Sequence, residues 1–201
     1  MSAANLLRRL VDVLAAVIGL LVAAPVLLAA AGAVRWRMGS PVLFRQARLG
    51  RDAVPFTLLK LRTMRHPQPG REAPEFDHER LGRLGRLLRS TSVDELPSLI
   101  NLARGQITLV GPRPLPVHYL PRFTTEQRRR FDVTPGLTGL AQVAGRNTVD
   151  WPERLALDVR YVDERSLWLD LRLLLRTVPM VLRRHGIDAG GGVTMKELPQ
   201  Q

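Results

Sequence analysis

One uninterrupted apolar run dominates the N-terminal part of the chain. Between Val13 and Val34 no residue is charged, and Leu, Val and Ala occupy most positions. As an α-helix these roughly 22 residues would be ~33 Å long, enough to reach across the hydrocarbon core of a bilayer. A cleaved signal peptide fits less well, because its apolar core is usually only ~7–15 residues long. The pattern therefore predicts a helix that stays attached and enters a membrane.

Charge and proline placement bear on how this helix sits in the membrane. Basic residues flank it on both sides, at Arg8, Arg9, Arg35 and Arg37. Such flanks favour the cytoplasmic side for both ends. Pro25 lies near the middle, where it removes a helical hydrogen bond and favours a kink between two arms. A re-entrant hairpin satisfies both observations, but a kinked spanning helix stays open, since membrane helices tolerate proline. Asp12 follows Arg8 by one turn, so an i,i+4 pair between them would ease its placement at the interface.

The rest of the chain alternates short β-like runs with amphipathic helical ones. Residues 41–45 and 55–60 are apolar runs on either side of a Gly-Arg-Asp turn, which predicts a hairpin. Residues 65–77 are rich in proline and charge and are expected to form a loop. Apolar residues at helical spacing predict helices at 81–89, about 151–163 and 167–184. The last of these carries arginines opposite an apolar face, which suits both a membrane surface and a protein core.

Composition narrows the class of partner. The chain has 30 basic and 18 acidic residues, and its net charge of +12 favours anionic partners such as nucleic acid, phosphorylated metabolites or lipid headgroups. The aromatic content of 5% and the lack of a nucleic-acid-binding motif argue against nucleic acid. The absence of cysteine excludes disulfides and thiolate metal sites, and the four histidines lack the spacing of a zinc site. Any metal should therefore have oxygen ligands.

An adjacent pair of acids is the most informative candidate for chemistry. Ser92 and Glu95 have the spacing of a capping box, which would place Asp94 and Glu95 in the first turn of a helix. The unpaired amides and positive dipole end of a first turn favour ionised carboxylates and bound phosphate. Taken alone, acids in a first turn are more often ordinary helix caps.

Two further segments suggest a site for an anionic substrate. In the stretch 111–114 two prolines flank Arg113, which holds this arginine with little freedom in a geometry suited to bidentate phosphate binding. Residues 134–147 contain three glycines among small residues, which permits close approach of the backbone to a ligand, and they end with Arg146 and Asn147. Each segment alone is typical of a plain turn. Beside an acid pair and a membrane anchor, they predict a binding site for an anion.

From Arg8 to about Ile187 the chain resembles the bacterial sugar transferase family, the small monotopic phosphoglycosyl transferases that start glycoconjugate assembly. The matching segments follow the family's order and spacing: the basic pair and Asp12 before the apolar run, Gly39–Gln46, Lys60–Met64, Thr91–Pro97, Leu109–Pro114, Pro135–Asn147, Tyr161–Asp163 and Ser166–Asp170.

This resemblance implies a mechanism. Asp94 and Glu95 correspond to the family's catalytic dyad, and Mg²⁺ is the expected cofactor, with both acids as its ligands. Asp94 is expected to attack the sugar-linked phosphate of a UDP-sugar, expel UMP and form a phosphosugar aspartyl intermediate, which polyprenyl (undecaprenyl) phosphate resolves. Glu95 is expected to help place Mg²⁺ or the acceptor phosphate. The expected phosphate and nucleotide ligands are Lys60, Arg62, Arg113, Arg146 and Asn147.

The resemblance also implies a fold and a location. We expect an α+β fold, in which an N-terminal re-entrant membrane helix hairpin kinked at Pro25 precedes a small cytoplasmic domain of amphipathic, interfacial helices with a short β-hairpin. The expected segments are the membrane helix (1–38), the catalytic domain (39–187) and a flexible C-terminal tail (188–201). Arg8, Arg9, Asp12 and Pro25 would form the membrane kink and interface. The enzyme would lie on the cytoplasmic face of the bacterial inner membrane and start the synthesis of an exopolysaccharide, O-antigen, capsule or glycoprotein glycan.

Some features depart from the common family pattern or leave alternatives open. Ala24 precedes Pro25 where serine is frequent, Gln106 replaces a common acid, and Ala144 replaces a frequent asparagine. No residue decides which UDP-sugar is used, and a homodimer stays open. A membrane-tethered module that only binds anions is the alternative from another class, although it does not account for adjacent acids beside a rigid arginine turn. A polyprenyl diphosphate hydrolase is a third alternative.

Overall fold

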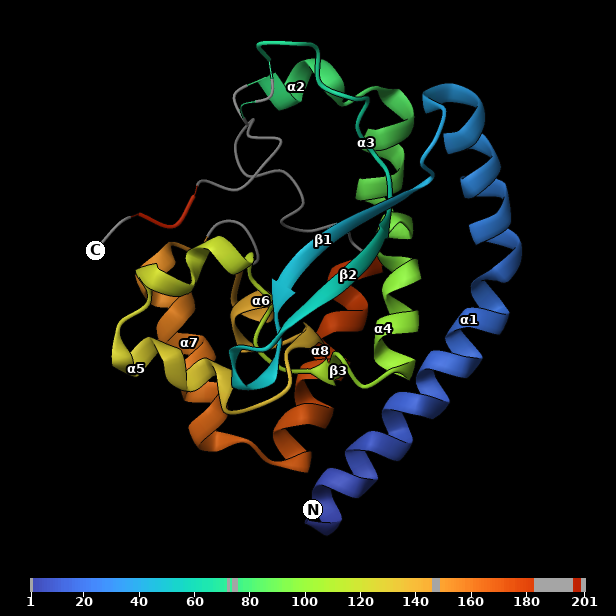
Figure 1. The fold of residues 1–201 in the computed structure, drawn as a ribbon. Helices are drawn as coiled ribbons and strands as arrows, with labels where there is room; N and C mark the ends of the chain where they lie inside the picture. Colours follow the sequence, from blue (N-terminus) through green and yellow to red (C-terminus); the bar gives the residue numbers. More distant parts are fainter. Residues whose placement is uncertain (1, 72, 74–75, 146–148, 183–196, 200–201) are drawn as a thin grey trace.

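The computed structural model describes residues 2–71, 73, 76–145, 149–182 and 197–199. The described chain is α+β, with one long helix beside a body of shorter helices and two small sheets (Figure 1). Its elements, where η marks a 3-10 helix, are in order α1 (Ala3–Met38), β1 (Leu43–Leu49), η1 (Arg51–Ala53), β2 (Pro55–Leu61), α2 (Asp77–Arg80), α3 (Arg83–Ser90), η3 (Val93–Ser98), α4 (Leu99–Ala103), β3 (Thr108–Val110), η4 (Val117–Arg122), α5 (Thr125–Arg128), η5 (Arg129–Phe131), β4 (Gly136–Thr138), α6 (Leu140–Gly145), α7 (Trp151–Glu164) and α8 (Leu167–Leu182).

The predicted apolar helix forms as α1. It begins at Ser2, whose hydroxyl accepts a hydrogen bond from the Asn5 amide (3.3 Å). It continues through Pro25 for 36 residues, a length of ~54 Å, and it is long and apolar enough to cross a membrane. Figure 1 shows its axis bending partway along. The re-entrant hairpin stays a prediction.

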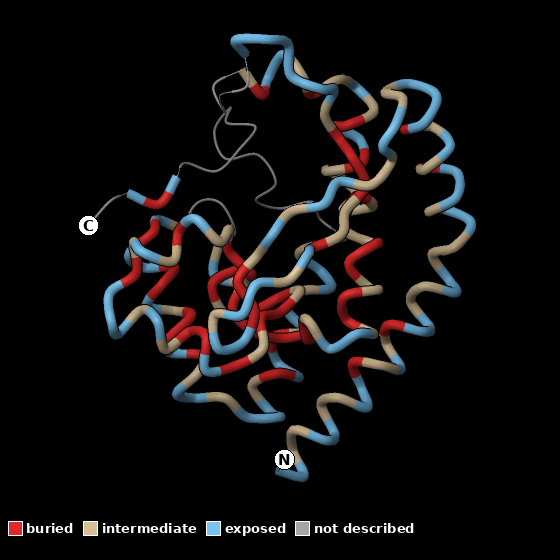
Figure 2. The backbone as a smooth tube through the Cα atoms, viewed as in Figure 1, coloured by how far each residue is buried: buried red, intermediate tan, exposed pale blue. Residues whose placement is uncertain are grey.

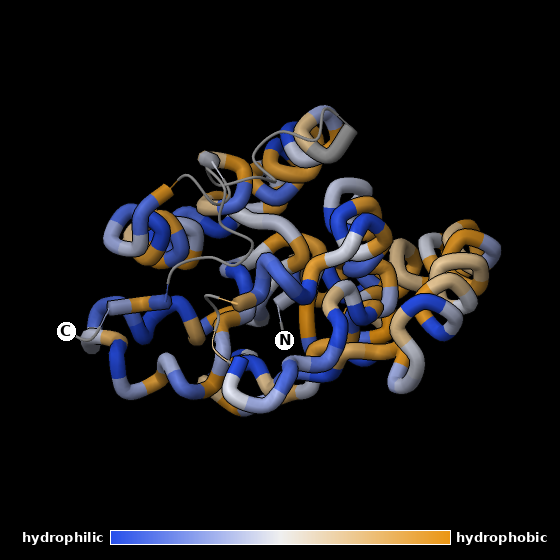
Figure 3. Tube along the Cα trace, turned by 90° about the horizontal axis from the view of Figure 1, so that it is seen from above, coloured by the Kyte–Doolittle hydropathy of each residue, from blue (hydrophilic) through white to orange (hydrophobic). Residues whose placement is uncertain are grey.

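Most of the surface of α1 is free of protein contacts. Leu21, Val22 and Leu28 are 71%, 73% and 75% exposed. The buried residues of α1 lie toward its two ends, at Asp12, Ala16, Ala30 and Val34. Figure 2 shows that burial is concentrated in the body of the protein, and Figure 3 shows apolar residues recurring along α1. So large an exposed apolar surface fits a helix whose free side contacts lipid.

Two small sheets organise the body. β1 and β2 pair antiparallel, with Leu43 opposite Leu61 and Leu49 opposite Pro55, which confirms the predicted hairpin. β3 and β4 pair in parallel, and this sheet was not predicted. β4 and α6 both lie within 134–147, so the described part of this glycine-rich segment is a strand and a helix and not a plain turn.

The predicted amphipathic helices also form, as α3, α7 and α8. One core cluster packs η4, η5 and α7 against the β1–β2 hairpin through aromatic residues, including Tyr119, Phe131 and Trp151. In α8, Leu173 is 1% exposed, whereas Trp168 and Leu175 are each 64% exposed. One face of this helix therefore enters the core, while the other stays apolar and open, and its contact with a membrane surface stays a prediction.

Candidate active site

The Asp94–Glu95 pair lies in the first turn of η3, directly after α3. Ser92 adopts the left-handed conformation (φ 56°, ψ 16°), and its side chain makes no capping hydrogen bond. The predicted capping box is therefore wrong, because a capping side chain needs extended backbone to reach the N3 amide. Instead, the Ser92 carbonyl accepts a hydrogen bond from the Glu95 amide (3.1 Å), so a tight turn presents both acids.

The Glu95 carboxylate lies between two cations that come from other segments. Lys60 Nζ, on β2, donates to Glu95 Oε1 at 2.6 Å, and Arg113 Nη2 donates to the same oxygen at 3.1 Å. These cations, Lys60 foremost, hold the pKa of Glu95 well below its ordinary value. The Glu95 side chain is 34% exposed, so it is an ionised group that solvent or a ligand can reach.

Asp94, in contrast to Glu95, lies in surroundings that raise its pKa. It is 8% exposed, and burial together with the neighbouring charge of Glu95 raises the pKa of Asp94 from 3.8 to about 6. The charges of Lys60 and Arg89 act against this rise but are weaker. Arg89 was expected only as part of a basic helix face, and the structure adds it to the site. At neutral pH Asp94 is thus mostly ionised yet poorly solvated, as suits an activated nucleophile.

Arg113 lies on a turn that is fixed from two sides. Gly111 and Gly136 approach so closely that a Cβ on Gly136 would lie 2.1 Å from Gly111 N. On the other side, Arg130 Nη2 donates to the Arg113 carbonyl (2.7 Å) and to Asp158 Oδ2 (2.7 Å). The side chains of this Arg130–Asp158 ion pair are each 2% exposed. The predicted restraint on Arg113 thus comes from buried contacts as well as from its flanking prolines.

A small cavity of about 30 Å³ adjoins Glu95, with Arg48, Lys60 and Arg113 among its walls. Arg48 Nη1 donates to the Pro114 carbonyl at 3.1 Å. Burial and the charge of Arg113 lower the pKa of Arg48 to about 10. Arg48 was missed at the sequence level because nothing in the local pattern of β1 separates it from other arginines of that strand.

Arg62 is not brought to the acid pair. Its guanidinium donates to the carbonyls of Met38, Gly39 (2.7 Å) and Ser40 (3.0 Å), where α1 ends. A cation bound to these carbonyls stabilises the C-terminal end of a helix. Arg62 therefore anchors α1 to β2. Arg146 and Asn147 lie outside the described residues.

The N-terminal end of α1 is anchored by the predicted interface residues. Arg8 Nε donates to Asp170 Oδ2 of α8 (2.6 Å), and Arg9 donates to the last two carbonyls of α4 (2.7 and 2.5 Å). Asp12 accepts hydrogen bonds from a hydroxyl (2.7 Å) and an amide (2.9 Å) of β3. The expected Arg8–Asp12 pair is therefore wrong, since both side chains reach across to other elements.

The acid pair has suitable donors for the expected metal. Within the described residues no group of three or more His, Cys, Asp or Glu side chains could hold an ion. Mg²⁺, however, keeps several waters and is usually held by one or two carboxylates together with substrate phosphates. Asp94 and Glu95 supply that donor set, so they fit Mg²⁺ bound with a phosphorylated substrate.

Comparison with known proteins points to one family. Residues 3–184 match the family described as "Bacterial sugar transferase". The chain is 45% identical over 189 residues to the uncharacterized sugar transferase EpsL of Bacillus subtilis, covering 94% of each chain. It is 43% identical over 190 residues to the UDP-glucose:undecaprenyl-phosphate glucose-1-phosphate transferase of Caulobacter vibrioides, covering 90% of this chain and 71% of that protein. It is 34% identical over 197 residues to the undecaprenyl-phosphate galactose phosphotransferase of Salmonella typhimurium, covering 90% of this chain and 41% of that protein.

Proposed function

Because the chain belongs to the bacterial sugar transferase family, we propose that it moves a sugar 1-phosphate from a UDP-sugar to undecaprenyl phosphate, through a covalent intermediate on Asp94. The observation that carries the proposal is the contrast between two adjacent acids. Asp94 is buried with a raised pKa, whereas Glu95 is held ionised by Lys60 and Arg113. Environments that push the pKa values of paired acids apart give them different chemical roles.

Two displacements at phosphorus would complete the reaction. In the first, an Asp94 carboxylate oxygen attacks the phosphorus that bears the sugar, and the bond to UMP breaks with its electron pair leaving on UMP. In the second, an oxygen of undecaprenyl phosphate attacks the same phosphorus, and Asp94 leaves as a free carboxylate. The products are UMP and undecaprenyl-diphospho-sugar. Splitting the transfer lets two bulky substrates use one site in turn.

The cations around the pair would bind the diphosphate. Lys60 and Arg113 already face the Glu95 oxygen, and Arg48 lies at the same small cavity. Their charges would offset that of the diphosphate, which otherwise repels an attacking carboxylate. Mg²⁺, held by Asp94 and Glu95, would neutralise further charge on the phosphates. Arg146 and Asn147 are proposed as further ligands on the strength of the family motif.

The membrane arrangement follows from how α1 is attached. Its N-terminal end is bound to α4, β3 and α8, and its C-terminal end is bound by Arg62, while the middle of the helix is exposed. A helix whose two ends are tied to one small body cannot easily place them on opposite faces of a bilayer. We therefore infer a re-entrant helix, with the catalytic domain on the cytoplasmic face of the bacterial inner membrane, where it meets the lipid phosphate at headgroup depth.

Trapping the intermediate tests the proposal. Purified protein is incubated with Mg²⁺ and a panel of UDP-sugars labelled with ³²P in the phosphate next to the sugar, with no acceptor present, and is then denatured. Label should stay on the wild-type chain, with one UMP released per label, and should be absent from Asp94→Asn. Asp52→Asn, an exposed acid of η1, is the matched control and should label as the wild type does.

Two outcomes would overturn this function. One is label that stays on Asp94→Asn. The other is UMP release that occurs in the wild type only when undecaprenyl phosphate is present, since direct transfer would then replace the covalent step. The UDP-sugar that gives the fastest labelling identifies the sugar.

A further inference from the structure

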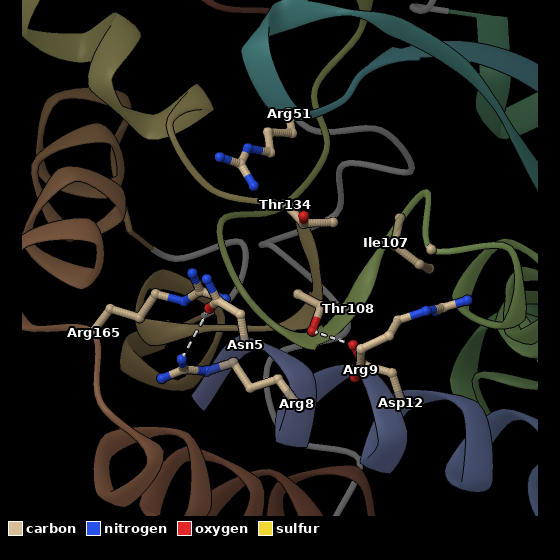
Figure 4. Close-up of a pocket in the computed structure, with 10 residues that line it drawn as sticks. Asn5, Arg8, Arg9, Asp12, Arg51, Ile107, Thr108, Thr134 and Arg165 are labelled. Atoms are coloured by element: carbon tan, nitrogen blue, oxygen red, sulfur yellow. Dashed lines mark hydrogen bonds between the residues drawn. The ribbon is translucent and has the colours of Figure 1, made fainter. Parts of the chain in front are cut away.

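A second, larger cavity lies apart from the acid pair. Its volume is about 150 Å³, and it is lined by the N-terminal turns of α1, the turn after β1, β3 and the connection between α7 and α8 (Figure 4). Neither Asp94 nor Glu95 lines it, although Ile107 borders both this cavity and the small one beside Glu95. The volume is several times what a buried water needs, so a phosphate-sized group fits.

The lining of this cavity is strongly cationic. Arg8, Arg9, Arg51 and Arg165 line it, and among the described lining residues Asp12 is the one carboxylate. The Asp12 oxygens already accept hydrogen bonds from β3. Asp12 interacts with Arg9, but four guanidinium groups against one lining carboxylate leave an excess of positive charge, so the cavity favours an anion.

The arginines differ in how far their donors are already used. Arg8 is bound to Asp170 (2.6 Å), and the Arg9 guanidinium is bound to the carbonyls of α4. The Arg165 Nε, by contrast, is buried and has no hydrogen-bond partner among the described residues. Such a group costs stability unless a ligand or water satisfies it. The Arg165 guanidinium also interacts with the Tyr161 hydroxyl, so Nε is the Arg165 donor that still lacks an acceptor among the described residues.

Arg51 faces the cavity from the opposite wall. Figure 4 shows its side chain reaching in from the turn after β1, while Arg165 lies beside Asn5 and Arg8. The contact of Arg51 with Asp52 is loose, at 3.6 Å, and its side chain is 59% exposed. Two guanidinium groups on different walls, with Thr134 also in the lining, provide donors suited to phosphate oxygens.

The helices around the cavity also carry exposed apolar residues of the kind that contact lipid. On α1, Leu6, Leu7 and Leu10 are 53%, 48% and 53% exposed, and on α8 Trp168 is 64% exposed. Apolar residues of this kind beside arginines are typical of protein at the headgroup level of a membrane. The anions available at that depth are lipid phosphates.

We propose that the cavity between α1, η1 and α8 binds the phosphate group of an anionic lipid, at a site separate from Asp94 and Glu95. Arg51 and Arg165 donate to the phosphate, and the acyl or prenyl chain lies along the exposed apolar faces of α1 and α8. A phospholipid headgroup and the phosphate of a polyprenyl lipid offer the same chemistry. The site does not depend on the phosphoryl transfer itself.

Native mass spectrometry of the full chain in detergent tests the site. The protein is titrated separately with phosphatidylglycerol, undecaprenyl phosphate, zwitterionic phosphatidylcholine and inorganic phosphate. We expect a saturable adduct with one or both anionic lipids, and about tenfold weaker binding of that lipid to R51Q/R165Q, since charge-assisted hydrogen bonds are lost. R104Q/R176Q removes the same charge from two exposed arginines outside the cavity and should bind as the wild type does.

The separate titrations show which lipid supplies the bound phosphate group. Phosphatidylglycerol binding that R51Q/R165Q weakens identifies a phospholipid site. Undecaprenyl phosphate binding that the same variant weakens identifies an acceptor-lipid site, and binding that it leaves unchanged belongs to the Asp94 site. Asp94→Asn should bind the lipid as tightly as the wild type, which keeps this result independent of the transfer reaction. Arg51→Gln, a change at an exposed residue, repeats the test if the double variant unfolds.

The proposal is overturned if R51Q/R165Q and Arg51→Gln bind anionic lipid as the wild type does. It is also overturned if R104Q/R176Q weakens lipid binding as much as R51Q/R165Q does, or if inorganic phosphate binds and neither lipid does.

Discussion

At the scale of single residues, Asp94 and Glu95 are chain neighbours in opposite electrostatic surroundings. Glu95 shares one oxygen with Lys60 and Arg113, whereas Asp94 is buried and feels the charge of Glu95. The turn at Ser92 starts η3, and successive side chains of a 3-10 helix point in different directions, so the two adjacent acids face different surroundings. One acid is thereby a fixed anion among cations, and the other is a buried carboxylate with a raised pKa, which suits the nucleophile proposed above.

The raised pKa of Asp94 predicts a cost in stability at neutral pH. Its folded-state pKa of about 6 lies above the ordinary value of 3.8, so the unfolded chain binds fewer protons between these values and stability falls as the pH rises through them. The free energy of unfolding of the wild type should fall by ~2.5 kcal/mol between about pH 4 and pH 7 relative to Asp94→Asn. Denaturation of both proteins in detergent with EDTA measures the difference, and parallel pH profiles would contradict the raised pKa.

The buried Arg130–Asp158 pair predicts an indirect effect on the site. Because Arg130 also holds the Arg113 carbonyl, Asp158→Asn should destabilise the fold by ~3–5 kcal/mol and lower kcat/KM for UDP-sugar at temperatures where the variant is folded. Asp163→Asn breaks an exposed pair with Arg129 and is the matched control, with an expected loss of only ~0–1 kcal/mol. Unchanged stability of Asp158→Asn would show that the pair does not support the turn.

At the scale of elements, α3 is seated by a close backbone contact. A Cβ on Gly85 would lie 1.9 Å from the Thr63 carbonyl and 2.8 Å from Leu81 Cδ1, whereas a Cβ on Gly82 would meet nothing within 4 Å. Since α3 leads directly into the turn that presents Asp94, its seating on the end of β2 sets where the acids lie.

Alanine at these two glycines gives a matched comparison. Gly85→Ala should cost ~1–3 kcal/mol and reduce phosphosugar labelling of Asp94, because α3 must move away from Thr63. Gly82→Ala, at the N-cap of the same helix, should change stability by less than ~1 kcal/mol. Thermal unfolding with the labelling assay measures both, and equal effects of the two changes would argue against the close contact.

At the scale of the whole molecule, both ends of α1 are tied to one body and its middle is exposed. Asp12 binds β3 near one end, and Arg62 binds the Met38 and Gly39 carbonyls at the other. The apolar middle, around Leu21, Val22 and Leu28, needs lipid around it. An exposed apolar middle fits a body that lies at a membrane surface, and in the re-entrant arrangement proposed above this one helix bends into the hydrocarbon.

Cysteine accessibility tests that arrangement, since the chain has no cysteine of its own. Ser2→Cys and Arg37→Cys should both resist a membrane-impermeant maleimide in intact spheroplasts and both react after permeabilisation. Arg160→Cys on α7, where the arginine side chain is 62% exposed, reports the side of the catalytic domain and should behave identically. Labelling of Ser2→Cys alone in intact spheroplasts would mean that α1 spans the bilayer.

Local patterning was sufficient wherever an element depends on residues close in the chain. The apolar run became α1, the two β-like runs around 50–52 became the β1–β2 hairpin, and leucine spacing located α3, α7 and α8. These predictions hold because the period of apolar positions decides which face of an element can be buried. Motif order along the chain was likewise enough to indicate the family.

Only the tertiary structure decided which groups each charged side chain contacts. Arg62 and Arg113 looked equivalent as phosphate ligands, yet one binds the end of α1 and the other reaches Glu95. Arg48 and Arg165 carry no local signal, and the capping box failed because the chain turns left-handed at Ser92. The partner of a charged side chain is set by how separate elements pack, and its pKa by how much water that packing removes, so neither can be obtained from neighbours in the chain.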